Sequence, residues 1–171
     1  MQLDANGDAS ITAADIDGGS SDNCGIASLA ASQTDFDCSD VGPNNVTLSV
    51  TDLIGNVSTC VAVVTVVNDL DPTITCPADI TQDNDAGVCG AVVTFIGPIG
   101  TDNCVGTTIA QIAGLASGAT FPVGTTTNTF EITDASGNTA TCSFDVTVTD
   151  NEPPVAVCAD ITIQLDSNGD A

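Results

Sequence analysis

The chain has 171 residues, of which 23 are acidic and none is Lys, Arg or His, so its formal charge at pH 7 is −23. Nucleic acids and anionic membrane surfaces are excluded as partners, because proteins bind both through cationic side chains. Such a charge is typical of disordered chains, but 42% of the residues are hydrophobic, and the many Val, Ile and Thr side chains favour folded β-structure.

The carboxylates repel one another in any compact fold. Bound cations would relieve this repulsion, and sites rich in oxygen favour Ca²⁺. The alternative is an acidic surface that only maintains solubility. We favour coordinated Ca²⁺.

Eight cysteines are present without a single histidine and without a C-x-x-C pair. This pattern argues against zinc ligation and for disulfides, which predicts an oxidising, extracellular location. Met1 is followed by Gln2, Leu3 and Asp4 rather than by a basic and apolar signal sequence, and no apolar run reaches membrane-spanning length. Because an exported protein needs a signal, we expect the chain to be a segment of a longer protein.

The first expected element is a tight turn over 4–8, where Asn6-Gly7 supplies the positive φ of a hairpin. The alternative is a calcium loop over 4–15, because oxygen-bearing residues occupy its positions 1, 3, 5, 7, 9 and 12 as in an EF-hand. Ala9 stands where that loop needs Gly, and no flanking helix is predicted beyond weak helical character at 12–17. The hairpin is therefore preferred.

The remaining elements are all predicted to be strands. An alternating pattern ends near residue 67 and is followed by a linker at 68–72 with the sequence NDLDP. Strands at 74–82 and 90–96 flank a turn at 84–87, and strands at 127–133 and 140–149 form a hairpin across 134–138. Residues 97–126 give no clear strand assignment. A second linker, DNEPP at 150–154, precedes another strand-like segment. Short strands with Gly, Asn and Asp turns are typical of a seven-strand sandwich.

Internal repetition divides this all-β chain. QLDANGDA at 2–9 returns as QLDSNGDA at 164–171, which is 162 residues further on. The cysteines repeat at intervals of 82, 82 and 80 residues in the pairs Cys60/Cys142, Cys76/Cys158 and Cys24/Cys104. We therefore predict two related modules, at 1–69 and 70–152, with 153–171 as the first strand of a further copy.

The second module resembles the hyalin repeat (HYR) of bacterial surface proteins. The resemblance is carried by CPADIT at 76–81, GVCGAVVTF at 87–95, TDNC at 101–104, SGATFPVGTTT at 117–127 and TDASGNTATCSFDVTVTD at 133–150. The first module is similar to Ig-like repeats that alternate with hyalin repeats in large secreted adhesins of the Bacteroidetes group. The resemblance implies tandem immunoglobulin-like β-sandwich modules in an extended array, with an adhesive or structural role and no catalytic residues.

Two hypotheses describe how copies are joined, since the first module lacks its first strand and 153–166 resembles it. The copies could share one continuous backbone. Alternatively, each subunit could donate 153–171 as a strand to the next subunit and form a non-covalent polymer. Both arrangements propagate head to tail.

Disulfides are expected from positions in an Ig sandwich. The first and last strands begin at one pole, which favours Cys76–Cys142. Cys89–Cys104 is then the remaining pair of the second module, and Cys24–Cys38 is a local pair of the first. Cys60 is left over, and by analogy it should bond the counterpart of Cys158 in a preceding copy. Other connectivities remain open.

Calcium is expected at both linkers, because acidic turns of both neighbouring modules should meet there. The candidate ligands at the first linker are Asp4, Asn6, Asp8, Asn68, Asp69, Asp71, Asp102 and Asp134. Those at the second linker are Asp83, Asp85, Asp150 and Glu152, joined by Asp22 and Asp52 of the next copy.

The preferred function is a structural repeat unit of an extracellular filament or stalk at the cell surface, stabilised by calcium and disulfides, with identical copies as partners. An adhesin that grips glycans or surfaces is the first alternative, although no Trp or Tyr is present to stack on sugars. A glycosidase based on paired carboxylates is a remote alternative, and we expect the chain not to be an enzyme.

Overall fold

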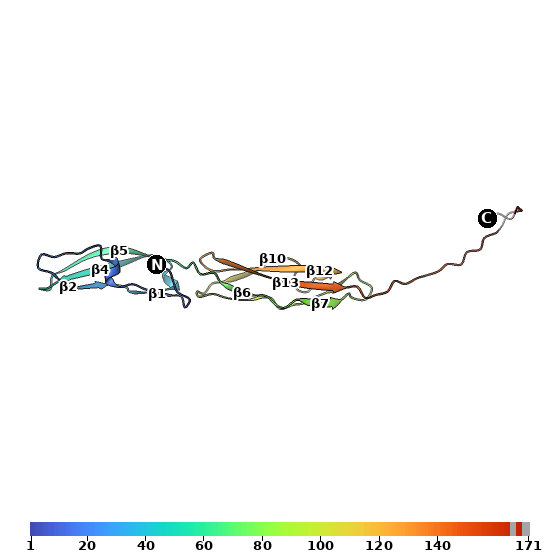
Figure 1. Ribbon diagram of the computed structural model, residues 1–171, viewed down its shortest axis with the longest axis horizontal. Coiled ribbons are helices and arrows are strands. Elements are labelled where there is room, and N and C mark those ends of the chain that lie inside the picture. The colour runs from blue at the N-terminus through green and yellow to red at the C-terminus, as the bar shows by residue number, and fades with distance from the viewer. Residues whose placement is uncertain (165–166, 169–171) are drawn as a thin grey trace.

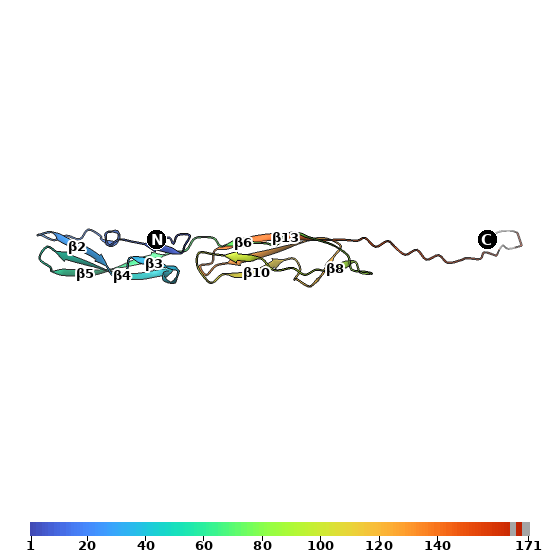
Figure 2. The ribbon, with the colours of Figure 1, turned by 90° about the horizontal axis from the view of Figure 1, so that it is seen from below.

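The computed structural model describes residues 1–164 and 167–168 and is all-β there, as predicted (Figure 1). Its helices in this part of the chain are two short 3₁₀ turns, η1 (Ala13–Ile16) and η2 (Cys38–Asp40). Neither is long or apolar enough to cross a membrane. The strands form two groups that share no sheet and lie end to end (Figures 1 and 2).

The first strand group pairs a three-stranded sheet with a short two-stranded one. The sheet order is β2-β4-β5, and β1 pairs antiparallel with β3. The bounds are β1 Asp8–Ser10, β2 Ile26–Ala31, β3 Asp35–Asp37, β4 Gly42–Asp52 and β5 Val57–Val66. Its core packs Leu3 and Phe36 against Val46, Val64 and Val66. Successive side chains of a strand point to opposite faces, and this alternation turns Val64 and Val66 inward on β5.

The second strand group adds two two-stranded sheets to a four-stranded one. The large sheet has the order β10-β12-β13-β7, and the small sheets are β8-β11 and β6-β9. The bounds are β6 Thr73–Thr75, β7 Ile80–Asp83, β8 Gly90–Val92, β9 Ile99–Thr101, β10 Thr108–Ala113, β11 Thr120–Pro122, β12 Gly124–Thr133 and β13 Thr139–Thr149. The core lies between the β8-β11 pair and the large sheet, where Phe121 meets Phe130 and Phe144.

The two groups follow one plan. The sheet β2-β4-β5 corresponds to β10-β12-β13, and the pair β1-β3 corresponds to β8-β11. The parallel pairing of β7 with β13 returns in the first group as a single parallel bridge between Gln2 and Val67. Within residues 1–67, no pair corresponds to β6-β9.

Several predicted strands differ in extent. The strand expected over 74–82 is divided into β6 and β7, because Pro77 has no N–H to continue a ladder. The unassigned region 97–126 contains β9, β10 and β11. The hairpin across 134–138 is present as β12-β13. Residues 150–164 form no strand in the described structure and run away from the second group (Figures 1 and 2).

Candidate functional site

Two disulfides are formed, and each spans 66 residues of sequence. The expected Cys76–Cys142 bond is present within the second group. The second bond joins the groups, from Cys38 after β3 to Cys104 after β9. The remaining cysteines, Cys24, Cys60, Cys89 and Cys158, are unpaired and exposed.

The expected pairs Cys24–Cys38 and Cys89–Cys104 are therefore wrong. In each pair, one cysteine lies at the junction between the groups and the other at the far end of a sheet. Cys24 precedes Ile26, which pairs with Asp52 at one end of β4, whereas Cys38 lies beside the other end of β4. The loop before Cys89 contacts the second linker through a bond from Gly87 N–H to Glu152.

Two equivalent aspartate-capped turns close the hairpins β4-β5 and β12-β13. Asp134 Oδ1 accepts backbone N–H bonds from Ser136 and Asn138, at 2.9 and 2.7 Å. Asp52 Oδ1 accepts bonds from the N–H groups two and four residues further on, both at 2.9 Å. In each turn an asparagine side chain donates to the second carboxylate oxygen. Both carboxylates, expected as calcium ligands, are thus already hydrogen-bonded as turn caps.

Asn68 is the centre of the junction. This linker residue is 4% exposed. Its Nδ2 donates to Asp134 Oδ2 at 3.2 Å, and its Oδ1 accepts from Asn103 Nδ2 at 3.2 Å. Asn138 Nδ2 donates to the Asn68 carbonyl at 2.8 Å, and Asn103 Nδ2 also donates to the Asp4 carbonyl at 3.1 Å. The linker is therefore held by the final hairpin of the second group and, through Asn103, by the first turn of the first group.

Asn138 was not among the predicted site residues. A signal for it exists in the sequence, since Asn56 occupies the same place in the first hairpin and the turn is repeated. An asparagine that recurs with a capping aspartate indicates a shared turn structure rather than a metal ligand.

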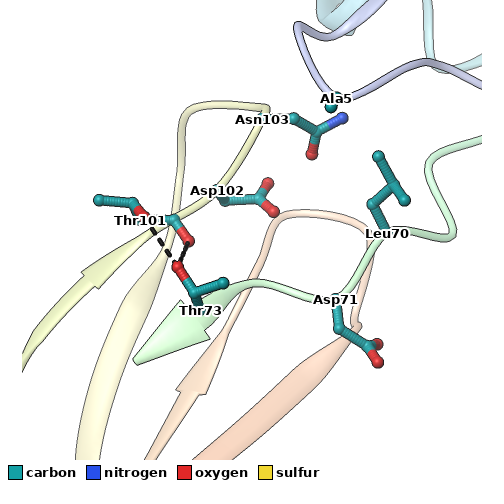
Figure 3. Close-up of a pocket in the computed structure, with 7 residues that line it drawn as sticks. All are labelled: Ala5, Leu70, Asp71, Thr73, Thr101, Asp102 and Asn103. Carbon is teal, nitrogen blue, oxygen red and sulfur yellow. Dashed lines mark hydrogen bonds between the residues drawn. The ribbon is translucent and has the colours of Figure 1, made fainter. Parts of the chain in front are cut away.

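Asn103 has an unsatisfied acceptor at this junction. Its Oδ1 is buried and has no hydrogen-bond partner. It lies beside an open cavity of about 360 Å³. The lining residues are Ala5, Leu70, Asp71, Thr73, Thr101, Asp102 and Asn103 (Figure 3). Asp102 and Asn103 turn side-chain oxygens toward the same space, whereas the Asp71 carboxylate points away from it (Figure 3).

The fit of these residues to Ca²⁺ is partial. Asp102 and Asn103 offer neighbouring oxygens, and an unpaired buried carbonyl oxygen favours a positive partner. However, no three His, Cys, Asp or Glu side chains of the described chain are grouped so as to hold a metal ion. Asp4 caps its own turn, with Oδ1 accepting from the N–H groups of Asn6 and Asp8. The turn over 4–8 that the sequence favoured is present and leads directly into strand β1, so the alternative EF-hand-like loop is not formed.

The candidate ligands of the second linker are also hydrogen-bonded. Asp83 accepts from the Thr149 hydroxyl at 2.7 Å, and Asp85 accepts from Val92 N–H at 2.9 Å. Asp150 accepts from Glu152 N–H at 3.1 Å. These contacts anchor the end of β7 and the linker, and each of these carboxylates has a hydrogen-bond partner within the chain.

Asp22 and Asp52 line one cavity of about 150 Å³ at the far end of the first group. A glycosidase would need one carboxyl with a raised pKa as its acid. Burial raises the pKa of Asp52, but hydrogen bonds from Asn56, Ile54 and Gly55 outweigh it and the net pKa is lowered. Asp52 is therefore unsuited to act as that acid.

Replacing Asp134 by Asn should weaken the junction in a pH-dependent way. Burial, the largest effect, raises the pKa of Asp134, but hydrogen bonds from Asn138, Gly137 and Ser136 lower it overall. The stabilisation is then fully present above the unfolded pKa of about 3.9 and lost as pH falls through the folded pKa. We expect a loss of about 1–3 kcal/mol at pH 7, because the new Nδ2 would face the donors of Asn68 and Asn138. Urea unfolding followed by circular dichroism at pH 7 and at decreasing pH measures it.

The matched control is Asp52→Asn. Asp52 caps the same turn but receives no bond from a linker asparagine. Its replacement should destabilise less, and equal losses for the two variants would contradict a role of Asp134 in the junction.

Comparison with known proteins finds similarity for the second group. The family model described as "HYR domain" matches residues 68–148. Hyalin of Strongylocentrotus purpuratus is 37% identical over 112 residues, and hyalin of Lytechinus variegatus is 36% identical over 115 residues. These alignments cover 63% and 64% of this chain, but only 9% and 22% of those proteins.

The expected bacterial context finds no support in these relatives, which are sea urchin proteins. Among solved structures, the extracellular cadherin domains 1–5 of protocadherin gamma B2 are 16% identical, with a TM-score of 0.36. That alignment covers 77% of this chain and 32% of the protocadherin chain. A likeness this low carries no functional inference.

Proposed function

We propose that this chain, whose residues 68–148 match the HYR domain model, is a structural repeat unit of an extracellular filament or stalk. Identical copies would follow one another head to tail, with modules at 1–69 and 70–152 and with 153–171 belonging to the next copy. The observation that carries this proposal is the junction, where a disulfide and a buried asparagine join two strand groups end to end.

The junction suits a spacer that resists bending. The Cys38–Cys104 bond and the Asn68 contacts join the groups at different points. Bending at the linker would separate Asn68 from Asp134 and Asn103 and leave buried polar atoms unpaired, which costs about 1–3 kcal/mol for each group. Two disulfides in a chain with only five aromatic residues also favour an oxidising location outside the cell.

A filament is preferred to an adhesin that binds glycans directly. Sugars stack on aromatic faces, and the chain has no Trp or Tyr. Cryo-electron microscopy of the native material tests the proposal, and we expect filaments with an axial repeat of two strand groups. Globular particles in place of filaments, or specific binding of this chain to a glycan array, would favour the adhesin.

We also propose that Ca²⁺ strengthens the junction, with Asp102 and Asn103 as ligands. At a hundredfold excess over its dissociation constant, one bound ion would stabilise the fold by about 2.7 kcal/mol. We expect EDTA to lower the melting temperature of the wild type, and added Ca²⁺ to restore it. The cation would neutralise the Asp102 carboxylate and give the unpaired Asn103 oxygen a partner, since both line the same cavity (Figure 3).

The variant Asp102→Asn should lose this response. In the monomeric chain Asp22→Asn is the matched control, since Asp22 accepts the N–H of Cys24 as Asp102 accepts that of Cys104, but at the end away from the junction. A wild-type melting temperature that is unchanged by EDTA would reject the calcium proposal and leave the filament proposal standing.

A further inference from the structure

Four exposed cysteines have no partner, and they lie at two ends of the described structure. Cys24 and Cys60 belong to the first group, whereas Cys89 and Cys158 belong to the second group and the segment after it. Since the two groups share one strand arrangement, each of these cysteines can be compared with the residue at the equivalent position of the other group, whose contacts are known.

Cys60 corresponds to Cys142. Both follow the asparagine of an aspartate-capped hairpin turn by four residues, on strands β5 and β13. Cys142 is bonded to Cys76, which lies just after β6. Cys158 lies six residues before Gln164, which repeats Gln2. Gln2 bridges Val67 as Asp83 pairs with Thr149, and Cys76 lies seven residues before Asp83, so the two spacings agree within one residue. Cys158 of one copy is therefore placed to bond Cys60 of another.

Cys24 corresponds to Cys104. Each follows an Asp-Asn pair, and in each the cysteine N–H donates to the aspartate, at 2.8 and 3.0 Å. The turn before Cys104 docks on the preceding group, where Asn103 donates to the Asp4 carbonyl and Cys104 bonds Cys38. The turn before Cys24 has the same Asp-Asn-Cys sequence and the same capping hydrogen bond, and it lies at the end of the first group away from the junction.

Cys89 is the cysteine that such a turn would meet. In the first group Gly7 precedes β1, and a Cβ built on Gly7 would lie 2.6 Å from Cys38 Sγ and 2.9 Å from the Asn103 carbonyl oxygen. Asp8 pairs with Asp37, as Gly90 pairs with Pro122, so Cys89 occupies the place of Gly7 and Val123 that of Cys38. The second group therefore carries its cysteine before β8, whereas the first group carries Cys38 on the opposite strand, after β3. The turn before β8 is one residue longer than the turn before β1.

A strand is also missing where the second copy would dock. The first group has no counterpart of the β6-β9 pair, and its residues 19–21, which precede the Asp22 turn, belong to no strand in the described structure. The N–H of Ser20 donates to Asp17, which leaves the N–H of Ser21 for a ladder. The residues before Cys158 stand where β6 stands before Cys76. Val155 and Val157 there are 89% and 88% exposed, an apolar strand-like segment without a sheet.

We propose that a second copy of this chain docks its first group on the end of the second group, with residues 155–157 pairing against 19–21 and with two disulfides, Cys24–Cys89 and Cys60–Cys158, across the contact. This inference rests on the proposed head-to-tail function and extends it to a covalent bond pattern. Each bond forms when two thiols lose two protons and two electrons to a disulfide oxidant, such as oxidised glutathione, which is reduced to two thiols. All eight cysteines are then paired.

Complementary variants of the 171-residue chain test the proposal. One chain carries Cys24→Ser and Cys60→Ser and keeps Cys89 and Cys158, and the other carries the reverse pair of substitutions. Neither should form covalent oligomers alone in a glutathione redox buffer, whereas their mixture should give a heterodimer on a non-reducing gel. Because the chain has no Lys or Arg for trypsin, a protease that cuts at Asp should release the two linked peptides for mass spectrometry.

Chains with single free cysteines provide the control. Cys89 should cross-link to Cys24 at least tenfold faster than to Cys60, and Cys158 should show the reverse preference. Equal rates, no heterodimer, or an internal Cys24–Cys60 bond would overturn the proposal. Filaments that lack these bonds would reject this inference alone, while formation of the bonds without native filaments would reject the proposed function alone.

Discussion

Replacing both Cys76 and Cys142 by alanine will lower the free energy of unfolding by about 4 kcal/mol, because a bond across 66 residues restricts the unfolded chain. This loop encloses almost all strands of the second group, from the end of β6 to the middle of β13. Both cysteines also pack against the Phe121 and Phe144 core, so truncation removes contacts as well as the bond. Urea unfolding is best followed by far-ultraviolet circular dichroism, since no Trp or Tyr is present for fluorescence.

The measurement belongs in a background in which the four unpaired cysteines are replaced by serine. Those side chains are exposed, and surface substitutions change stability by about 0.5 kcal/mol or less. This background should therefore unfold like the wild-type monomer. A loss below about 1 kcal/mol for the double variant would mean that the bond does not constrain the second group as the structure indicates.

The all-β fold could be predicted because its long strands carry regular patterns. On β13, Phe144, Val146 and Val148 alternate with polar residues, and a Gly-containing turn separates this strand from β12. The strands that sequence patterns missed lack such alternation. β9 and β11 have only three residues each, and all residues of β10 are exposed, so burial imposes no pattern on them.

The candidate site was harder to predict, for two physical reasons. Aspartates such as Asp134 and Asp52 were correctly placed in turns, but the backbone N–H groups that stabilise their charge there come from the folded turn and are not visible in the sequence. The Cys38–Cys104 bond depends on how the two groups dock. Local spacing favours nearby partners and carries no information on contacts across a linker. The repeat, by contrast, was visible in sequence, and it is the feature that relates the unpaired cysteines to known contacts.

Replacing both Cys38 and Cys104 by alanine should uncouple the two strand groups while leaving their sheets intact. Cys104 is 9% exposed and belongs to the core of the first group beside Leu3 and Phe36, so this bond anchors the second group in the hydrophobic interior of its neighbour. The contacts that remain at Asn68 are hydrogen bonds, each of which contributes about 0.5–1.5 kcal/mol. We expect small-angle X-ray scattering to show a broader distribution of distances, and urea unfolding to separate into two transitions.

The Cys76–Cys142 double variant is the matched control for this experiment. Both bonds span 66 residues, so the chain-entropy model assigns them the same effect on the unfolded state. They differ in what they join, since one lies within the second group and the other crosses the junction. Broadened scattering from the Cys38–Cys104 variant alone would place the stiffness of the chain in that bond. No broadening from either variant would place the stiffness in the linker contacts around Asn68. Equal broadening from both variants would mean that the Cys38–Cys104 bond has no specific part in it.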